Sequence, residues 1–150
     1  MQVSIQITGV EKVYQKLNRL GQGLYNFNEA MRLIGQDLVS YYANEGFGSQ
    51  GGVFDHVWPR LSSKYSVYKA KKWPGRGILE ASGAMRHGFI YSANSTSVAV
   101  DNQVDYFKYH QSTAPRTKMP WRPSMGVNDQ VKERIKTIIE ADIRLKIDRA

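Results

Sequence analysis

The chain has 150 residues, which is enough for one domain with a buried core but short for two. It holds no cysteine, which excludes disulfides, thiolate catalysis and cysteine-based zinc sites. It carries 21 Lys and Arg against 13 Asp and Glu, a net charge of +8 that favours an acidic partner or a nucleic acid. No apolar run approaches the ~20 residues that cross a bilayer, and the first residues do not resemble a signal peptide. We therefore expect a soluble domain that is made in the cytoplasm and has no membrane partner.

Two kinds of periodicity define the first 45 residues. Apolar residues alternate with polar ones over residues 2–8 and predict a half-buried strand, which Gly9 ends. Helical spacing then predicts a short amphipathic helix over about 10–20 and a longer helix over about 28–45. The apolar stripe of the longer helix is typical of a surface that faces a core, and it consists of Phe27, Met31, Ile34, Leu38 and Tyr42.

Residues 44–57 differ from their surroundings, because four glycines lie among few side chains that a core could hold. This composition predicts a mobile loop. The apolar residues Phe47, Val53 and Phe54 leave two interpretations open. Either one aromatic side chain pins the loop, or the segment becomes ordered only against a partner.

The next 30 residues predict one helix and two short irregular pieces. Ser62 or Ser63 can cap a helix that ends near residue 72, because a serine side chain accepts a hydrogen bond from a free backbone N–H. The Trp-Pro-Gly sequence within residues 73–77 predicts a turn. Residues 78–86 predict a short helical or turn segment.

The last 60 residues complete the predicted fold. Residues 88–92 and 97–101 predict the strands of a β-hairpin, and residues 104–111 predict one or two helical turns. Residues 112–125 are proline-rich and irregular. Asn128 or Asp129 caps a final helix over about 129–148. We expect a single α+β domain over residues 1–150, with two longer amphipathic helices packed on a small, mostly antiparallel sheet and with long flexible loops.

The positive charge is concentrated in one segment. Residues 60–90 hold seven basic residues and one acidic residue, a net charge of +6, and the rest of the chain holds the other +2. Such a cluster can face a nucleic acid or an acidic protein ring, or it can be a solvated helix face. The residues that we assign to this basic patch are Arg60, Lys64, Lys69, Lys71, Lys72 and Arg76.

Aromatic residues lie among these cations and suggest an alternative function. Trp58, Tyr65, Tyr68 and Trp73 could stack on bases while the cations neutralise phosphates, as in a basic nucleic-acid-binding module that uses residues 58–76. No helix-turn-helix, zinc finger or ribonucleoprotein motif frames the segment. The same aromatic side chains could instead pack in the core.

No pattern in the sequence indicates catalytic, cofactor or metal chemistry. His56, His87 and His110 lack the spacing that places two imidazoles on one helix face. The glycine-rich segment lacks the frame of a phosphate-binding loop, and Ser82 lacks that of a nucleophile elbow. We therefore predict no catalytic residues, no cofactor and no metal, and keep a small hydrolase that uses His110 as a third alternative.

Four short motifs follow one another between residues 58 and 129. In chain order they are Trp58-x-x-Leu61-x-x-x-Tyr65-x-x-x-Lys69, Ile78-Leu79-x-x-Ser82-Gly83-x-Met85-Arg86, Tyr106-x-x-x-His110-Gln111 and Pro120-Trp121-Arg122-Pro123-x-Met125-Gly126-Val127-Asn128-Asp129. Their order and spacing resemble those of the tail-completion proteins of tailed bacteriophages, which act in virion morphogenesis and head–tail joining. The resemblance covers about residues 28–148. Thr113 and Ser124 depart from the family pattern, which favours glycine and an aromatic residue at these places.

The resemblance implies an α+β protein without an active site, located in the tail or neck of the virion after synthesis in the cytoplasm of the host bacterium. It implies a homo-oligomer, expected to be a hexameric ring, at the head-proximal end of the tail. The ring would contact the tail tube or tail terminator protein on one side and a head-completion or connector protein on the other. DNA passing through its channel would make non-specific contacts.

A closed ring needs a heterologous interface, in which one surface of a subunit meets a different surface of its neighbour. We expect one such surface in the 44–57 loop, with Phe47, Phe54 and the adjoining Trp58 as anchors. We expect the other in residues 112–125, with Trp121 and Arg122, because Trp and Arg are common interface hot spots. The basic patch would then face an acidic neighbour or the DNA channel.

Overall fold

The computed structural model describes residues 10–23, 26–112 and 119–150. Within these ranges the chain forms six α-helices, a π-helical turn, a 3-10 turn and one antiparallel sheet of two strands. The prediction of a single α+β domain is therefore confirmed. The strand that the sequence predicts over residues 2–8 lies outside the described residues.

Helix α2 (Asn28–Tyr41) is the centre of the fold. Its predicted stripe is buried at Ile34 and Leu38, and the helix continues through a π-helical turn over Tyr42–Gly46. The hydroxyl of Tyr42 donates a hydrogen bond of 2.8 Å to the carbonyl of Gly126, and burial raises the pKa of Tyr42 to about 12. The long helix predicted over 28–45 is thus confirmed, and its last turn is tied to the segment before the final helix.

The hairpin packs against one side of α2. Strand β1 (Phe89–Ala93) pairs antiparallel with β2 (Val98–Asn102), in a register that runs from Phe89 opposite Asn102 to Ala93 opposite Val98. A Cβ atom at Gly35 would lie 2.3 Å from the ring of Tyr91, so glycine is needed for the helix to approach the strand this closely. Both strands lie within one residue of their predicted positions.

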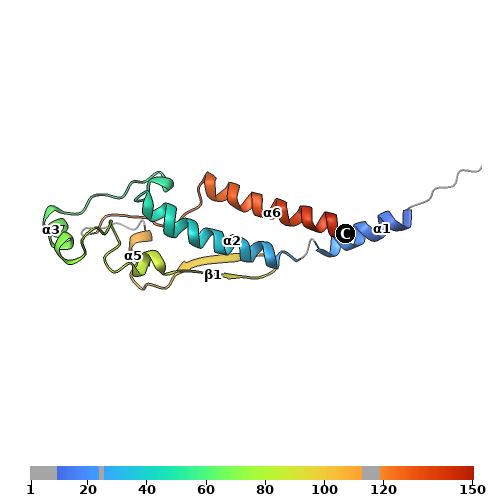
Figure 1. Cartoon of the computed structure of the whole chain (residues 1–150), viewed down its shortest axis with the longest axis horizontal. Helices are drawn as coiled ribbons and strands as arrows, with labels where there is room; N and C mark the ends of the chain where they lie inside the picture. The colour runs from blue at the N-terminus through green and yellow to red at the C-terminus, as the bar shows by residue number, and fades with distance from the viewer. Residues whose placement is uncertain (1–9, 24–25, 113–118) are drawn as a thin grey trace, which may run out of the picture.

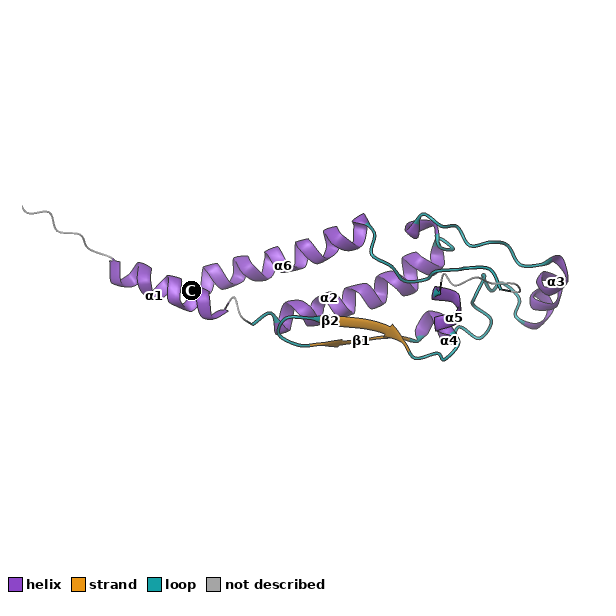
Figure 2. Ribbon diagram, turned by 180° about the vertical axis from the view of Figure 1, so that it is seen from behind, coloured by secondary structure: helices purple, strands orange, loops and turns teal. Residues whose placement is uncertain are grey.

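Helix α6 (Asp129–Arg149) packs on α2 rather than on the sheet, so α2 lies between α6 and the hairpin (Figure 1, Figure 2). Its first turn is capped by Asn128, whose Oδ1 accepts a hydrogen bond of 2.8 Å from the backbone N–H of Val131. Arg134 forms an ion pair of 2.9 Å with Asp37 of α2. The final helix and its asparagine cap are confirmed.

The molecule is elongated, with one helix at each end (Figure 1). Helix α1 (Val10–Gly23) extends beyond the end of α6, and helix α3 (Ser63–Lys72) lies at the opposite end, beyond the hairpin. Two short helices, α4 (Ala84–His87) and α5 (Phe107–Gln111), lie between the hairpin and α3. The helices predicted near the N-terminus and after Ser62 are confirmed.

The glycine-rich segment after α2 is folded, which agrees with the interpretation in which one aromatic side chain pins the loop. Phe47 is fully buried and packs edge to face on Trp58, with ring centroids 5.2 Å apart. The backbone N–H of Gly51 donates to the carbonyl of Gly46 at 3.0 Å, and that of Trp58 to the carbonyl of Gln50 at 2.7 Å. The π-helical turn positions Phe47 in the core. The glycine content of the segment does not predict this turn.

Candidate functional site

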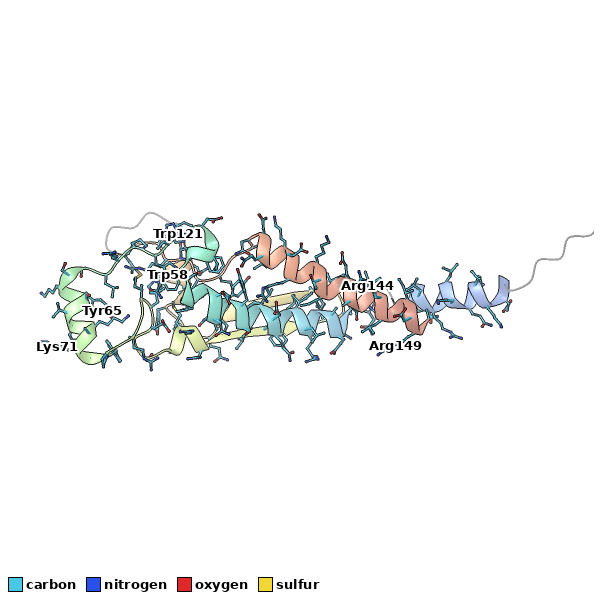
Figure 3. The ribbon with its side chains drawn as sticks, turned by 45° about the horizontal axis from the view of Figure 1, so that its top comes forward. Trp58, Tyr65, Lys71, Trp121, Arg144 and Arg149 are labelled. Atoms are coloured by element: carbon cyan, nitrogen blue, oxygen red, sulfur yellow. The ribbon has the colours of Figure 1, made fainter. Side chains whose placement is uncertain are left out.

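The end of the molecule formed by α3 carries several exposed cations, among them Lys71, which is labelled in Figure 3. The helix begins after Ser62, whose Oγ accepts a hydrogen bond of 3.3 Å from the backbone N–H of Tyr65. Five of the six predicted basic-patch residues are exposed on this helix or its flanks, namely Arg60, Lys64, Lys71, Lys72 and Arg76. We call these five residues the exposed basic patch.

Three of the four predicted aromatic residues lie beside the exposed basic patch. Tyr65 and Tyr68 are exposed on α3, and the rings of Tyr68 and Trp73 meet edge to face at 6.2 Å. The ammonium group of Lys72 lies 4.6 Å from the Trp73 ring centroid and 5.7 Å from that of Tyr68. A cation over an aromatic face is a favourable contact, so these side chains hold one another in place on the surface.

Lys69 does not belong to this surface, which corrects the sequence assignment. It is only 5% exposed, and its ammonium group donates a hydrogen bond to the carbonyl of Gly77. Burial lowers the pKa of Lys69, and the nearby Glu80 carboxylate opposes that shift. Lys69 lies one helical turn after Tyr65, and its side chain points towards the loop that follows α3. There it stabilises the loop and does not face a partner.

Arg122 is also a structural residue, which corrects its assignment as an interface hot spot. Its guanidinium donates to the carbonyl of Pro59 through Nε at 3.0 Å and through Nη2 at 2.8 Å, and to the carbonyl of Arg60 at 3.3 Å. The side chain is buried, and that burial lowers the pKa of Arg122. The arginine therefore joins the segment before α6 to the segment before α3.

We expect Arg122→Ala to lower the free energy of unfolding by about 2 kcal/mol, because carbonyls that the guanidinium satisfies lose their partner. Arg60→Ala is the matched control, since this neighbouring arginine is exposed, and it should change stability by no more than about 0.5 kcal/mol. Urea titration followed by circular dichroism measures both. Equal midpoints for the two variants would contradict the structural role of Arg122.

The four other predicted interface residues divide by burial. Phe47 and Trp58 are buried, and the indole N–H of Trp58 donates to the carbonyl of Pro123 at 2.6 Å. These two residues pack the core of their own chain, which corrects their assignment as anchors for a partner. Phe54 is half-buried, with its ring 6.0 Å from that of Tyr42.

Trp121 alone among the predicted anchors keeps a large exposed area. Its ring packs against His56 with centroids 4.4 Å apart, and its indole N–H donates to the carbonyl of Gln111 at 3.1 Å. Ser124, which departs from the family pattern, is fully buried, and its backbone N–H donates to the side chain of Gln111. Thr113 lies outside the described residues. The structure thus places Trp121 on the surface and draws the residues after it inward.

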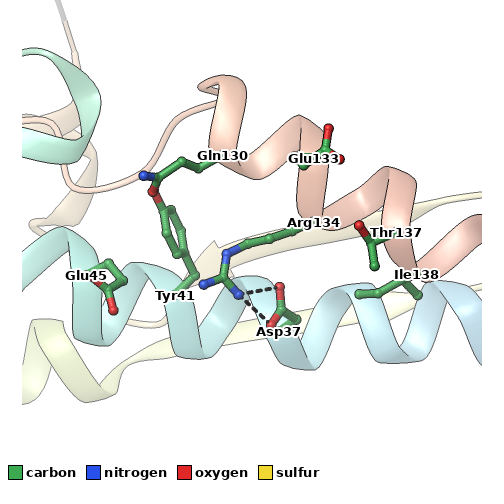
Figure 4. Close-up of a pocket in the computed structure, with 8 residues that line it drawn as sticks. All are labelled: Asp37, Tyr41, Glu45, Gln130, Glu133, Arg134, Thr137 and Ile138. Carbon is green, nitrogen blue, oxygen red and sulfur yellow. Dashed lines mark hydrogen bonds and ion pairs between the residues drawn. The ribbon is translucent and has the colours of Figure 1, made fainter.

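A groove between α2 and α6, with a volume of about 590 Å³, was not predicted from the sequence (Figure 4). Its lining residues lie at helical spacing on each helix: Asp37, Tyr41 and Glu45 on α2 and its extension, and Gln130, Glu133, Arg134, Thr137 and Ile138 on α6. The helical spacing of these residues in the sequence could have shown that each helix has one such face. Only the packing of α6 on α2 shows that the two faces meet.

The part of the chain that the structure describes contains no group of three or more His, Asp or Glu side chains that could hold a metal ion. Among the helices in those same ranges, none combines the length and the apolar character that a membrane span requires.

Comparisons with curated proteins and with solved structures gave no match. Residues 8–144, which are most of the chain, match the model of the phage virion morphogenesis family. The match confirms the resemblance seen in the ordered motifs. Membership of such a family implies a virion-associated, structural role rather than a catalytic one. The chain therefore belongs to the phage virion morphogenesis family.

Proposed function

We propose that this protein completes the head-proximal end of a phage tail and joins the tail to the neck as an oligomeric ring. The observation that carries the proposal is that the elongated subunit has separate exposed surfaces at its two ends, with a packed body between them. One end bears the exposed basic patch, and the other bears the exposed apolar residues of α1. A joining subunit needs such separate surfaces, because it contacts its neighbours, the tail and the neck at the same time.

The exposed basic patch is the surface that we assign to an acidic neighbour at the head–tail junction or to DNA passing through the channel. Its five cations lie on one short helix and the residues beside it. Charged surfaces of this kind attract and orient an oppositely charged partner, and salt weakens that attraction. The partners that fit are the tail tube or tail terminator protein and a head-completion or connector protein.

The test is a phage in which the gene for this protein is deleted. We expect separate heads and tails in electron micrographs, and joined particles after complementation with the wild-type protein. Complementation with Lys64→Ala/Lys71→Ala/Lys72→Ala should restore fewer joined particles than complementation with a chain altered at exposed hairpin positions. If the phage that lacks this gene still forms particles with joined heads and tails, the proposal is wrong.

Nucleic-acid binding remains the second candidate function, because Tyr65 and Tyr68 are exposed beside the cations. If the patch itself binds DNA, five phosphate contacts would make log K fall with log salt at a slope of at most about −4.5. Tight DNA binding with a slope near this value would favour the second candidate. Weak binding, together with loss of head–tail joining in the triple variant, would favour the structural role.

A further inference from the structure

Helix α1 exposes an apolar stripe that its own chain leaves uncovered. Val13, Tyr14 and Leu17 are each about 60% exposed or more, at spacings that place them on one face. Within the described residues, Gly23 of α1 lies against Lys146 near the end of α6, and the polar side of α1 borders a pocket with Ala150, so the apolar stripe is the side left uncovered. An isolated helix of 14 residues is only marginally stable in water, so this stripe calls for a covering surface.

The same helix is basic along one side of that stripe. Lys12, Lys16 and Arg19 recur at spacings of four and three residues and so share a flank of α1, while Glu11 is the only acidic residue of the helix. The surface that covers α1 should therefore combine apolar side chains with carboxylates.

The groove between α2 and α6 has this composition (Figure 4). Ile138 supplies its apolar surface, while Tyr41, which is 2% exposed, forms the floor, with its ring beneath the Arg134 guanidinium at 4.7 Å. Arg134 neutralises Asp37 at 2.9 Å, whereas Glu45 and Glu133 are exposed and form no ion pair with any described residue. The groove therefore has two free carboxylates for a basic ligand and one cation that is already neutralised.

The groove also matches the stripe in length. Asp37 and Glu45 are eight residues apart on a continuous helical stretch, which spans about 12 Å at 1.5 Å per residue. Val13 and Leu20, two apolar residues along this side of α1, are seven residues apart, or about 10 Å by the same measure. Three or four side chains of α1 can thus lie along the groove.

We infer that α1 of one subunit docks into the α2–α6 groove of the next copy of the chain. In its own chain α1 lies beyond the C-terminal end of α6, whereas the groove is formed by the first half of α6 and the last part of α2 (Figure 1). The contact joins two different surfaces and is therefore heterologous, the type that closes rings. It rests on the proposed function in one respect, since it supplies the subunit interface of the proposed ring.

Cross-linking in the full chain tests the contact directly, because the wild-type protein has no cysteine. Leu17→Cys and Thr137→Cys proteins are purified separately, mixed and oxidised. We expect a covalent heterodimer on non-reducing gels. Gln15→Cys, on the polar face of α1, is the matched control and should give at most one tenth as much heterodimer with Thr137→Cys. Equal yields, or a disulfide confined to single chains when one chain carries both cysteines, would overturn the inference.

Self-association measured by sedimentation separates this inference from the proposed function. Leu17→Asp should weaken self-association at least tenfold and should leave the melting temperature unchanged at concentrations where the wild-type chain is dissociated, because Leu17 is exposed in the subunit. Lys16→Glu and Glu133→Lys should each weaken it, and their combination should restore part of the loss. If Leu17→Asp leaves the oligomer unchanged, the inference is wrong while the ring stands. If the wild-type chain stays monomeric at every concentration, the inference and the ring both fail, and the deletion test of head–tail joining still decides the rest.

Discussion

Ile34→Asp is expected to unfold the protein at room temperature. The side chain is 1% exposed on the face of α2 that packs in the core, so aspartate would place a carboxylate among apolar groups without a partner. The loss of packing and the cost of burying the acid should together exceed about 4 kcal/mol, a large part of the stability of a domain of this size.

Leu33→Asp provides a matched control, because Leu33 is the preceding residue of the same helix and is 41% exposed. Aspartate lowers helix propensity similarly at both positions, so the difference between the variants reports burial alone. We expect Leu33→Asp to stay folded with a loss of about 1 kcal/mol or less. Circular dichroism during urea titration measures both variants. A Leu33→Asp protein as unstable as Ile34→Asp would show that this face of α2 does not define the core.

Trp58→Ala is expected to cost about 3–5 kcal/mol, the range found for large aromatic side chains removed from cores. Trp58 is 2% exposed, packs on Phe47, and donates a hydrogen bond of 2.6 Å to the carbonyl of Pro123. A Cβ atom at Gly51 would lie 2.4 Å from the indole, so backbone and ring are in tight contact. Removing the ring leaves a cavity and frees a carbonyl at the same time.

Trp121→Ala is the matched comparison, since both tryptophans donate their indole N–H to a backbone carbonyl. Trp121 is 36% exposed, and we expect its removal to cost about 1 kcal/mol and to act on assembly instead of folding. Thermal unfolding of each variant and head–tail joining by complementation separate the two effects. If Trp121→Ala unfolds as readily as Trp58→Ala, the exposed tryptophan is part of the core and not of a docking surface.

Regular elements could be predicted because each one repeats its apolar residues at its own period. The stripe through Ile34 and Leu38 and the asparagine before α6 are local signals, and local geometry decides what they form. The predicted interface residues were less reliable, because aromatic and basic side chains serve packing as well as binding. Phe47 and Arg122 are residue types that often anchor interfaces. Both are nevertheless buried by contacts with residues distant in the chain.

The sequence by itself determined the elements, their order, the absence of cysteine and the concentration of charge in residues 60–90. Its ordered motifs also indicated the family, which the match over residues 8–144 confirms. Only the tertiary structure decided that Lys69 faces inward, that α1 keeps its apolar stripe exposed, and that acidic residues of α2 and α6 border one groove. The physical reason is that the burial of a side chain, and the surface that it faces, depend on how the helices pack on one another. Asp37 and Arg134 are 97 positions apart, and they meet only because α6 packs on α2.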